Sequence, residues 1–332
     1  MQTISALIPT YNRAALIEQA IESVLNQTYP VHEIVIVDDG STDDTRTVVQ
    51  DYIHRSKNTD PPVRYIRQSQ QGAAVARNTG VAAASGDWIA FLDSDDRWLP
   101  EKIEWQVRAL EKFADISAAC VTDARFVNNP SLKRTAFQEA GAEFDGLIGI
   151  FQDLGKRIAY GYHGLYLQGL MVRLETIRRV GRFDPRLKLG DDSDFLFHLA
   201  SETMVCYVNK PLVEIDRTPR RTNGLMEMTR EEKTCLEINQ YLYEKWLSED
   251  RKLAPNVRKR IFWRLQEVHT GWSSWYLING DYKMARRALS TAMKYNFTGK
   301  VAFKWLLTMV APGLLRAALL KRRQRTPPSV LL

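Results

Sequence analysis

The aspartates Asp93 and Asp95 are the residues whose type and spacing most directly indicate chemistry. They follow the apolar run Trp88-Ile89-Ala90-Phe91-Leu92, so a buried strand would deliver them to the edge of a sheet. Hard cations such as Mg²⁺ and Mn²⁺ prefer carboxylate oxygen, and Mg²⁺ usually takes one or two protein carboxylates while phosphate and water complete its coordination. The pattern therefore indicates a divalent-cation site. The structural alternative is a turn whose aspartates cap the helix expected near Pro100.

The first hundred residues contain the elements that must position these side chains. Short apolar and β-branched runs predict strands, and apolar residues three and four apart predict helices between them. The expected strands are Ser5–Ile8, ending at Pro9, then Glu33–Val37, Val63–Ile66 and Trp88–Leu92; the expected helices are Ala14–Leu25, Thr42–Ile53 behind an N-capping Ser41 or Thr42, and Ala73–Ala84. Strands separated by helices predict a parallel sheet in a three-layer α/β/α fold.

Polar loops follow three of these strands. In open α/β sheets, ligands bind beyond the carboxyl ends of the strands. That rule places Pro9-Thr10-Tyr11-Asn12, Asp38-Asp39-Gly40-Ser41 and Asp93-Ser94-Asp95-Asp96 at one edge. Acidic groups crowded together repel one another unless a cation is present, so this shared position favours the metal role over the simple turn.

Beyond residue 100 the chain is irregular at first and then almost wholly helical. We expect a helix over Pro100–Phe113, a strand over Ser117–Thr122, and a helix at Phe195–Ala200 behind the cluster Gly190-Asp191-Asp192-Ser193-Asp194. Helical patterns dominate from about Met226 onward. We therefore expect an α/β domain over residues 1–220 and a helical, basic C-terminal extension over residues 221–332.

Charge divides the chain in a similar place. Residues 1–250 hold 29 Lys and Arg against 37 Asp and Glu, whereas residues 251–332 hold 17 against 2. Such a basic block can serve nucleic acid or an anionic membrane surface, and charge alone does not choose between them. The three cysteines fit neither a disulfide framework nor a zinc site, and no secretory signal peptide is visible, so we expect a cytoplasmic protein.

Four segments together resemble glycosyltransferase family two. They are Ile8-Pro9-Thr10-Tyr11-Asn12-Arg13, Val37-Asp38-Asp39-Gly40-Ser41-Thr42-Asp43, Ala76-Arg77-Asn78-Thr79-Gly80 and Phe91-Leu92-Asp93-Ser94-Asp95-Asp96. Their order and spacing match the family, and four motifs in register are a specific signal where one would be weak. The resemblance covers about residues 1–220. It implies a GT-A fold, a nucleotide-diphospho-sugar donor and inversion at the anomeric carbon.

The same resemblance implies roles for individual residues on the donor side. Residues that match the nucleotide-sugar-binding positions are Pro9, Thr10, Tyr11, Arg13, Asp39, Arg77, Asp93 and Ser94. Asp39 would accept a hydrogen bond from the base, Asp93 would approach the ribose, and Asp95 would hold Mn²⁺ or Mg²⁺. Structural alternatives remain open: Pro9 ends a strand and Tyr11 packs. For Asp38 the structural role of stabilising a turn is favoured.

The acidic cluster before Phe195 resembles the family's Glu-Asp-x-Asp element, with Asp191 in the place of the glutamate. The resemblance implies that Asp192 is the general base that deprotonates the acceptor hydroxyl. This requires Asp192 to lie within hydrogen-bond reach of that hydroxyl. The structural alternative is that these aspartates stabilise the start of the following helix, where negative charge is favourable.

The resemblance implies a glycosyltransferase, and we expect a UDP-sugar donor and a saccharide or lipid-linked acceptor in cell-surface polysaccharide or glycan biosynthesis. The alternative within the same fold is a nucleotide-sugar-binding protein without catalysis. A Rossmann-type oxidoreductase is excluded, because it needs Gly-x-Gly-x-x-Gly after its first strand and this sequence has Pro9-Thr10-Tyr11-Asn12-Arg13 there.

The stretch Val301–Leu320 is mostly apolar, but Lys304, Thr308, Pro312 and Arg316 recur every four residues and draw a narrow polar stripe. With the basic cluster that follows, the stretch fits a helix in an anionic membrane interface, which would place the protein on the cytoplasmic face of the inner membrane. The alternative is a helix that packs on the catalytic domain and hides its apolar face. Nucleic acid is not an expected partner, because the sequence shows no nucleic-acid-binding module.

Overall fold

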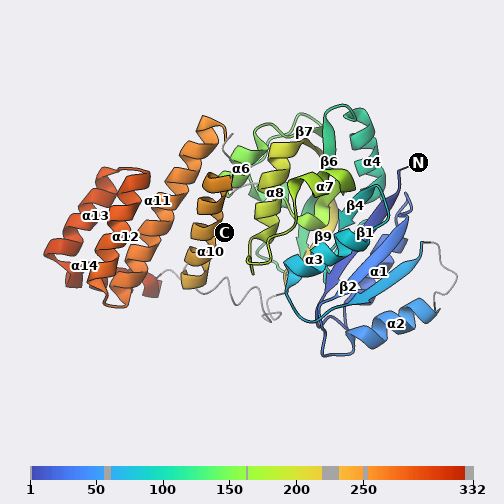
Figure 1. Cartoon of the computed structure of the whole chain (residues 1–332), viewed down its shortest axis with the longest axis horizontal. Coiled ribbons are helices and arrows are strands. Elements are labelled where there is room, and N and C mark those ends of the chain that lie inside the picture. The colour runs from blue at the N-terminus through green and yellow to red at the C-terminus, as the bar shows by residue number, and fades with distance from the viewer. Residues whose placement is uncertain (1, 56–60, 162–163, 219–231, 250–252, 326–332) are drawn as a thin grey trace. The chain divides into compact units, whose positions relative to one another are not determined.

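The computed structural model describes residues 2–55, 61–161, 164–218, 232–249 and 253–325 (Figure 1). The chain divides into two compact units. The first comprises Met1–Ile158 and Tyr162–Arg221, and the second comprises Ala159–Gly161 and Thr222–Leu332.

The described residues of the first unit form one mixed sheet with the strand order β3-β2-β1-β4-β8-β6-β9-β5, and β7 pairs with β9. Strands β1 to β4 run parallel, as do β6 and β9, while β8 lies antiparallel between β4 and β6. The strands are β1 (Ile4–Thr10), β2 (Glu33–Asp38), β3 (Val63–Arg67), β4 (Trp88–Phe91), β5 (Arg97–Trp98), β6 (Ser117–Val127), β7 (Ile148–Ile150), β8 (Leu170–Arg173) and β9 (Met204–Asp216).

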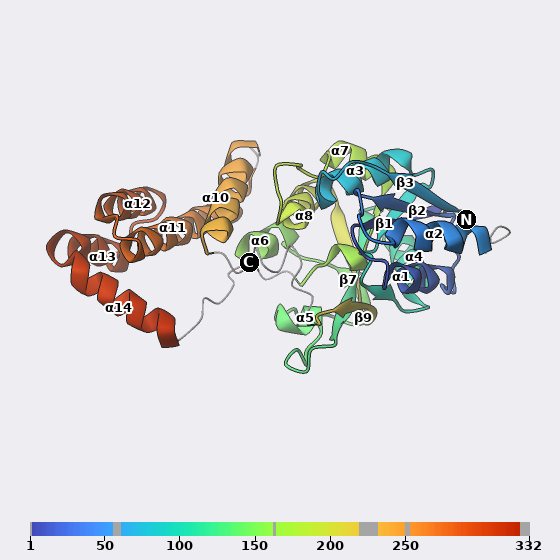
Figure 2. The ribbon, with the colours of Figure 1, turned by 90° about the horizontal axis from the view of Figure 1, so that it is seen from below.

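Helices cover both faces of the sheet, with α3 and α7 on one side and α1 and α4 on the other (Figure 2). The helices are α1 (Ile17–Leu25), α2 (Thr45–Arg55), α3 (Ala73–Ala83), α4 (Lys102–Lys112), α5 (Ala136–Glu139), α6 (Leu154–Tyr160), α7 (Leu174–Val180) and α8 (Asp191–Glu202). Alternate residues along a strand face opposite sides of the sheet and pack against different helices. Ile8 and Ile36 join the core that contains α1, α2 and α4, whereas Val35 and Val37 pack with Ala76 of α3.

The expected α/β fold with a mainly parallel sheet is confirmed, although several element boundaries differ from the sequence prediction, two of them next to the loops at the carboxyl edge. Strand β1 continues through Pro9, where we expected it to end. Its register with β4 stops at Leu7, so Pro9 pairs on one side only, where the missing N–H is tolerated. Helix α2 begins at Thr45, where Oδ1 of Asp43 accepts a hydrogen bond from the N–H of Thr45 at 3.0 Å. The expected cap Ser41 binds the preceding loop, and its Oγ accepts from the N–H of Asn12.

The second unit is helical, as expected for the C-terminal region. Its described helices are α10 (Glu232–Glu249), α11 (Pro255–Ile278), α12 (Tyr282–Tyr295), α13 (Gly299–Val310) and α14 (Pro312–Arg325). Leu265 of α11 and Leu289 of α12 are fully buried, and the two helices contact each other. Asp281 caps α12 by accepting a hydrogen bond from the N–H of Met284 at 2.9 Å.

In the first unit, α3 approaches β1 closely at a glycine. A Cβ atom at Gly80 would lie 2.5 Å from Cδ1 and 2.7 Å from Cγ of Leu7, whose side chain is fully buried in the sheet. These separations are too short for non-bonded carbon atoms in a close-packed interior. Packing therefore explains the glycine that ends the Ala-Arg-Asn-Thr-Gly segment, and it fixes the helix that carries Arg77.

We predict that Gly80→Ala lowers the free energy of unfolding by about 1–3 kcal/mol, because the added methyl group overpacks the contact with Leu7. The matched control is Gly155→Ala in α6, where an added Cβ meets no atom within 4 Å. This control should be neutral or slightly stabilising, because alanine favours helix more than glycine does. Urea unfolding followed by circular dichroism measures both variants, and equal stability of the two would contradict the packing account.

Candidate active site

Asn12 ties the loop after β1 to the loop after β2. Its backbone is left-handed, with a φ of 52°, a conformation that asparagine adopts more readily than most residues. Its Oδ1 accepts a hydrogen bond from the N–H of Thr42 at 2.8 Å, and its own N–H donates to Oγ of Ser41 at 2.9 Å. The two loops therefore support each other at the carboxyl edge of the sheet.

Asp38 and Asp39 both hold main-chain segments at this edge. Asp38 accepts a hydrogen bond from the N–H of Ser41 at 2.7 Å, the turn-stabilising role that the sequence favoured. Asp39 is buried, and its Oδ2 accepts from the N–H of Gly72 at 2.7 Å while its Oδ1 accepts from the N–H of Gln71 at 2.9 Å. Asp39 thus fixes the approach to α3. Its Oδ1 also accepts from Nε2 of Gln68 at 2.7 Å, so the predicted contact with a nucleotide base would use the second lone pair of Oδ2.

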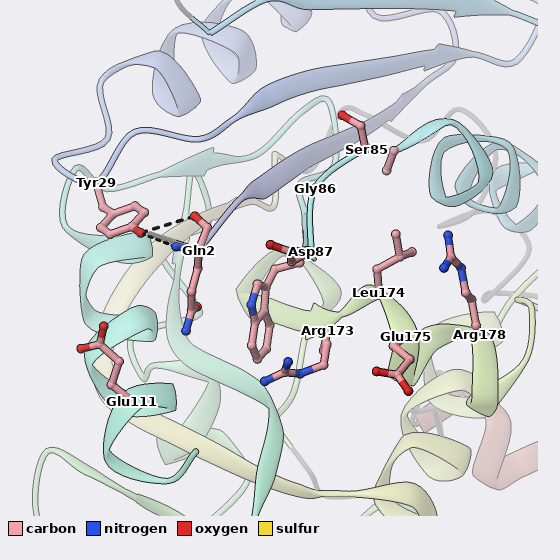
Figure 3. A pocket seen from close by; sticks show the side chains of 12 residues that line it. Gln2, Tyr29, Ser85, Gly86, Asp87, Glu111, Arg173, Leu174, Glu175 and Arg178 are labelled. Carbon is pink, nitrogen blue, oxygen red and sulfur yellow. Dashed lines mark hydrogen bonds between the residues drawn. The ribbon is translucent and has the colours of Figure 1, made fainter. Parts of the chain in front are cut away.

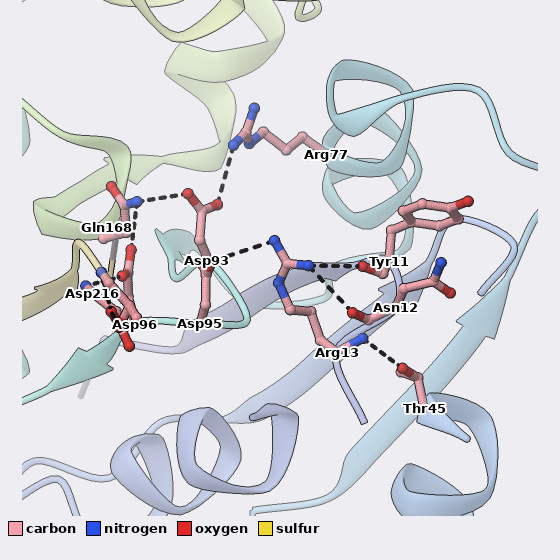
Figure 4. Close-up of polar contacts among 11 residues, drawn as sticks. Tyr11, Asn12, Arg13, Thr45, Arg77, Asp93, Asp95, Asp96, Gln168 and Asp216 are labelled. Atoms are coloured by element: carbon pink, nitrogen blue, oxygen red, sulfur yellow. Dashed lines mark hydrogen bonds and ion pairs between the residues drawn. The ribbon is translucent and has the colours of Figure 1, made fainter. Parts of the chain in front are cut away.

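Arg13 links the β1 loop to the acidic loop after β4 (Figure 4). Its main-chain N–H donates to Oγ1 of Thr45 at 2.7 Å, and its Nη1 donates to the carbonyl oxygen of Asn12 at 3.2 Å. Its Nη2 reaches Oδ2 of Asp95 at 3.4 Å. The three polar loops are therefore connected, as their positions after parallel strands predicted, and a cationic side chain lies beside the carboxylate expected to hold the metal.

Arg77 of α3 joins two acidic segments that lie far apart in the sequence. Its Nη2 donates to Oδ1 of Asp93 at 3.1 Å, and its Nη1 donates to Oδ2 of Asp191 at 2.5 Å. The side chain is buried, which by itself lowers the pKa of a guanidinium. The charges of Asp191, Asp93 and Asp192 outweigh that effect and raise the pKa of Arg77 above its ordinary value. Arg77 is therefore a permanent cation between the β4 loop and α8.

The acidic cluster forms the first turn of α8. The helix begins at Asp191 directly after Gly190, whose φ of 77° is left-handed. Asp191 is buried against Arg77, whereas Asp192 is half-buried and its Oδ1 accepts from the N–H of Ser193 at 2.7 Å. Because these aspartates lie at a helix start, they also fit the alternative that they only stabilise the helix. The burial difference nevertheless distinguishes the two acids: Asp191 anchors the helix, and Asp192 keeps contact with solvent.

Gln168 is a site residue that the sequence analysis missed. It is buried in the short 3₁₀ helix Leu167–Gly169, and its Nε2 donates to Oδ2 of Asp93 at 2.6 Å and to Oδ2 of Asp96 at 2.7 Å. Asp96 also accepts from the N–H of Asp216 at 2.8 Å. The only signal for Gln168 in the sequence is that it is a polar residue in an otherwise apolar stretch.

The remaining nucleotide-sugar-binding candidates lie at the same edge. Pro9 and Thr10 are buried at the end of β1, Ser94 is buried between Asp93 and Asp95, and Tyr11 is 37% exposed. The hydroxyl of Thr10 is buried, and it finds no hydrogen-bond partner among the described residues. Buried polar atoms are nearly always satisfied, so this hydroxyl is suited to a ligand.

The acidic loop fits a cation held by few protein groups. Burial, with the charges of Asp95 and Asp93, raises the pKa of Asp96 well above its ordinary value. The Asp95 side chain is 28% exposed, so its carboxylate is accessible. Within the described ranges no group of three or more His, Cys, Asp and Glu is placed to hold a metal ion. Asp95, with Asp93 beside it, would suit a cation that takes one or two protein carboxylates and completes its coordination with phosphate and water.

A pocket at the opposite end of β1 and β4 is a different feature (Figure 3). Part of its charged lining has structural partners. Oδ2 of Asp87 accepts from the hydroxyl of Thr3 at 2.7 Å, and the guanidinium of Arg173 lies 4.8 Å from the centre of the Trp88 ring. It lies at the amino ends of these parallel strands, away from the edge where ligands bind in such sheets. We assign the active site to the carboxyl edge.

The sheet order, the helical layers and the acidic loop after β4 define a fold of the nucleotide-diphospho-sugar transferase, or GT-A, class. Among solved structures, S. aureus TarS 1–349 matches 98% of this chain and 92% of its own length, with a TM-score of 0.67 at 17% identity. A likeness at this low identity establishes the fold.

The chain belongs to glycosyl transferase family 2, whose model matches residues 5–170. An uncharacterized glycosyltransferase from Rickettsia felis is 26% identical over 338 residues, which cover 95% of this chain and 49% of that protein. The Escherichia coli protein named UDP-Glc:alpha-D-GlcNAc-diphosphoundecaprenol beta-1,3-glucosyltransferase WfgD is 40% identical over 110 residues, 33% of this chain and 41% of WfgD. The chain spans about half the length of the Rickettsia relative.

We predict that Arg77→Met lowers the free energy of unfolding by about 3–5 kcal/mol, because it leaves two carboxylates without their buried cation. The matched control is Arg55→Met, which breaks the exposed pair between Arg55 and Glu18 and should cost less than about 1 kcal/mol. Urea unfolding at neutral pH measures both variants. Adding Asp191→Leu to Arg77→Met should recover part of the loss. Equal effects of the two arginine substitutions would contradict the bridging role.

Proposed function

We propose that this chain is an inverting glycosyltransferase that moves a sugar from a nucleoside-diphospho-sugar to a hydroxyl group of an acceptor. The observation that carries the proposal is the buried guanidinium of Arg77. It holds Asp93 of the β4 loop and Asp191 of α8 together, so the acidic loop suited to a donor lies next to Asp192. One site then contains groups for both the leaving and the attacking partner.

The donor side is formed by the loops after β1, β2 and β4. The unsatisfied hydroxyl of Thr10 and the exposed ring of Tyr11 provide a polar and an apolar contact for a nucleotide. Asp39 and Asp93 provide acceptors for the hydrogen-bond donors of a base and a ribose. We propose a UDP-sugar as the donor, which is supported by the name of WfgD, a relative that uses UDP-glucose.

We propose that Asp95 holds a divalent cation, Mn²⁺ or Mg²⁺, with Asp93 beside it. When bound, such a cation neutralises the negative charge that grows on the leaving diphosphate. Arg13 lies 3.4 Å from Asp95, so it is placed to add a second positive charge at the same point. Gln168 and Arg77 hold the two oxygens of Asp93 from opposite sides, which keeps this carboxylate in one orientation.

The acceptor side depends on Asp192. As the acceptor oxygen forms its bond to the anomeric carbon, the bond from that carbon to the diphosphate oxygen breaks, and the hydroxyl proton moves to the Asp192 carboxylate. The nucleoside diphosphate leaves, and attack opposite to it inverts the configuration at the anomeric carbon. Asp191 is held by Arg77 and fixes the helix, so Asp192 is a base on a rigid support.

We propose a saccharide on a lipid diphosphate as the acceptor. Support comes from the name of WfgD, which transfers glucose to a GlcNAc-diphosphoundecaprenol. Transfer to such an acceptor is a step in building surface polysaccharides, and we propose that class of pathway for this chain.

The donor and acceptor roles predict different defects in two variants. Asp95→Ala should weaken UDP binding in the presence of Mn²⁺ by about tenfold or more, a loss of about 1.4 kcal/mol, because the carboxylate for the cation is gone. Asp192→Asn should bind UDP as the wild type does and lose roughly 10²–10⁴-fold in transfer rate, because the amide cannot accept the proton. Calorimetric titration measures binding, and UDP release from UDP-glucose with a GlcNAc-diphospho-lipid measures transfer.

The control for both variants is Asp115→Asn, an exposed aspartate between α4 and β6, which should change neither quantity. Full wild-type activity in excess chelator would contradict the cation assignment. A wild-type rate in Asp192→Asn would contradict the base. Tight UDP binding by the wild type without turnover of any UDP-sugar or acceptor would instead support a binding protein without catalysis.

A further inference from the structure

Helices α13 and α14 turn polar side chains toward the interior of the second unit. Lys304 of α13 donates from Nζ to Oγ of Ser274 at 2.8 Å and to the carbonyl oxygen of Thr270 at 3.2 Å, both in α11. Arg316 of α14 donates from Nε to the carbonyl oxygen of Ile278 at 3.1 Å. These cations satisfy main-chain and side-chain acceptors of α11, so the polar stripe predicted from the sequence packs inward.

Thr308 belongs to the same stripe and is fully buried, with its hydroxyl donating to the carbonyl oxygen of Trp305 at 2.6 Å. Within the second unit the polar stripe is therefore covered, while the apolar face of the same stretch is not. The stretch also forms two helices in place of one, because the chain breaks at Ala311 before Pro312.

The outward face of the two helices is apolar. Phe303 is 62% exposed, Leu306 and Met309 are each 52% exposed, and Val310 is 77% exposed. Their spacing of three and four residues places them on one side of α13. Leu314, near the start of α14, is 76% exposed. Water-soluble helices usually have the opposite arrangement, with apolar side chains inside and polar ones outside.

This arrangement is typical of helices in contact with lipid. In a bilayer, apolar side chains face the hydrocarbon, while polar and ionisable groups turn inward and pair with other protein groups. No single helix in the described ranges is long and apolar enough to cross a membrane, although Gly299–Val310 and Pro312–Lys321 meet the criteria of length and composition together, with a bend of 117° between them. The pair therefore has the polarity expected of a segment embedded in one side of a bilayer.

Charge distinguishes a membrane from a second copy of the chain. No acidic residue occurs from Tyr282 to the end of the sequence, and Lys300 and Lys321 are exposed on α13 and α14. In a symmetric dimer the same face would meet itself, so these positive charges would repel one another. An anionic lipid surface instead attracts each of them, because its headgroups carry the opposite charge.

We infer that the outer face of α13 and α14, which we call the α13–α14 face, embeds in the interfacial layer of an anionic phospholipid membrane. Its residues are Phe303, Leu306, Met309, Val310 and Leu314, flanked by Lys300 and Lys321. The inference does not depend on the proposed sugar transfer, since it rests only on contacts within the second unit. It concerns the membrane association of the chain, and its test measures vesicle binding without any catalytic turnover.

The test is flotation of the full chain with vesicles of phosphatidylcholine alone and with about one third phosphatidylglycerol. The wild type should float with the anionic vesicles. The triple variant Phe303→Gln, Leu306→Gln and Val310→Gln should lose roughly tenfold or more in its vesicle partition coefficient, because the buried apolar area provides much of the binding. Its unfolding midpoint should be unchanged, because all three side chains are exposed and glutamine favours helix.

The matched control is Ile116→Gln, Leu147→Gln and Met204→Gln, three exposed apolar residues of the first unit, and it should float like the wild type. A wild type that stays unbound to both kinds of vesicle would overturn the inference, as would equal flotation of the wild type and the α13–α14 variant. A wild-type dimer by light scattering that the α13–α14 variant converts to a monomer would also overturn it, because the face would then be a self-association surface.

Discussion

The two ion pairs of Arg77 are the interaction on which the active site depends. A buried carboxylate without a cationic partner is costly, so one guanidinium allows the loop after β4 and the start of α8 to meet. The planar fork of arginine donates in two fixed directions, which a lysine ammonium does not match. Its neighbour Asn78 also binds a distant segment to α3, because its side-chain amide makes two hydrogen bonds with the main chain of Phe183. With Gly80 against β1, this segment of α3 joins sheet, loop and helix.

This arrangement separates two electrostatic tasks within one site. In the proposed reaction the leaving diphosphate needs positive charge, which Arg13 and a cation at Asp95 would provide beside the donor. The attacking hydroxyl needs a proton acceptor, the role proposed for Asp192. Without Arg77 between them, Asp93 and Asp191 would repel each other, and the β4 loop and the start of α8 would not be stable side by side. The fold thus keeps the carboxylate proposed to bind a cation close to the proposed base, Asp192.

Local patterns in the sequence predicted the elements that position the site, because the spacing of apolar residues and the length of a strand are local properties. The partners of Gln168 were not predictable in this way. Its amide donates to Asp93 and Asp96, more than seventy residues earlier in the chain, and the apolar stretch around Gln168 does not predict these partners. The C-terminal region shows the same limit: the spacing of Lys304 and Thr308 correctly identified one helical face, but spacing does not say whether that face meets water, lipid or protein.

The central claim is that the carboxyl edge of the sheet binds a nucleoside diphosphate together with a divalent cation. Thermal unfolding with UDP, Mn²⁺, both and neither tests this most directly, because a ligand that binds only the folded state raises the unfolding midpoint. The account predicts that UDP and Mn²⁺ together raise the midpoint more than the sum of their separate effects, and that Asp95→Ala removes the excess. A midpoint unmoved by UDP, GDP, ADP or dTDP, with or without the cation, would contradict it.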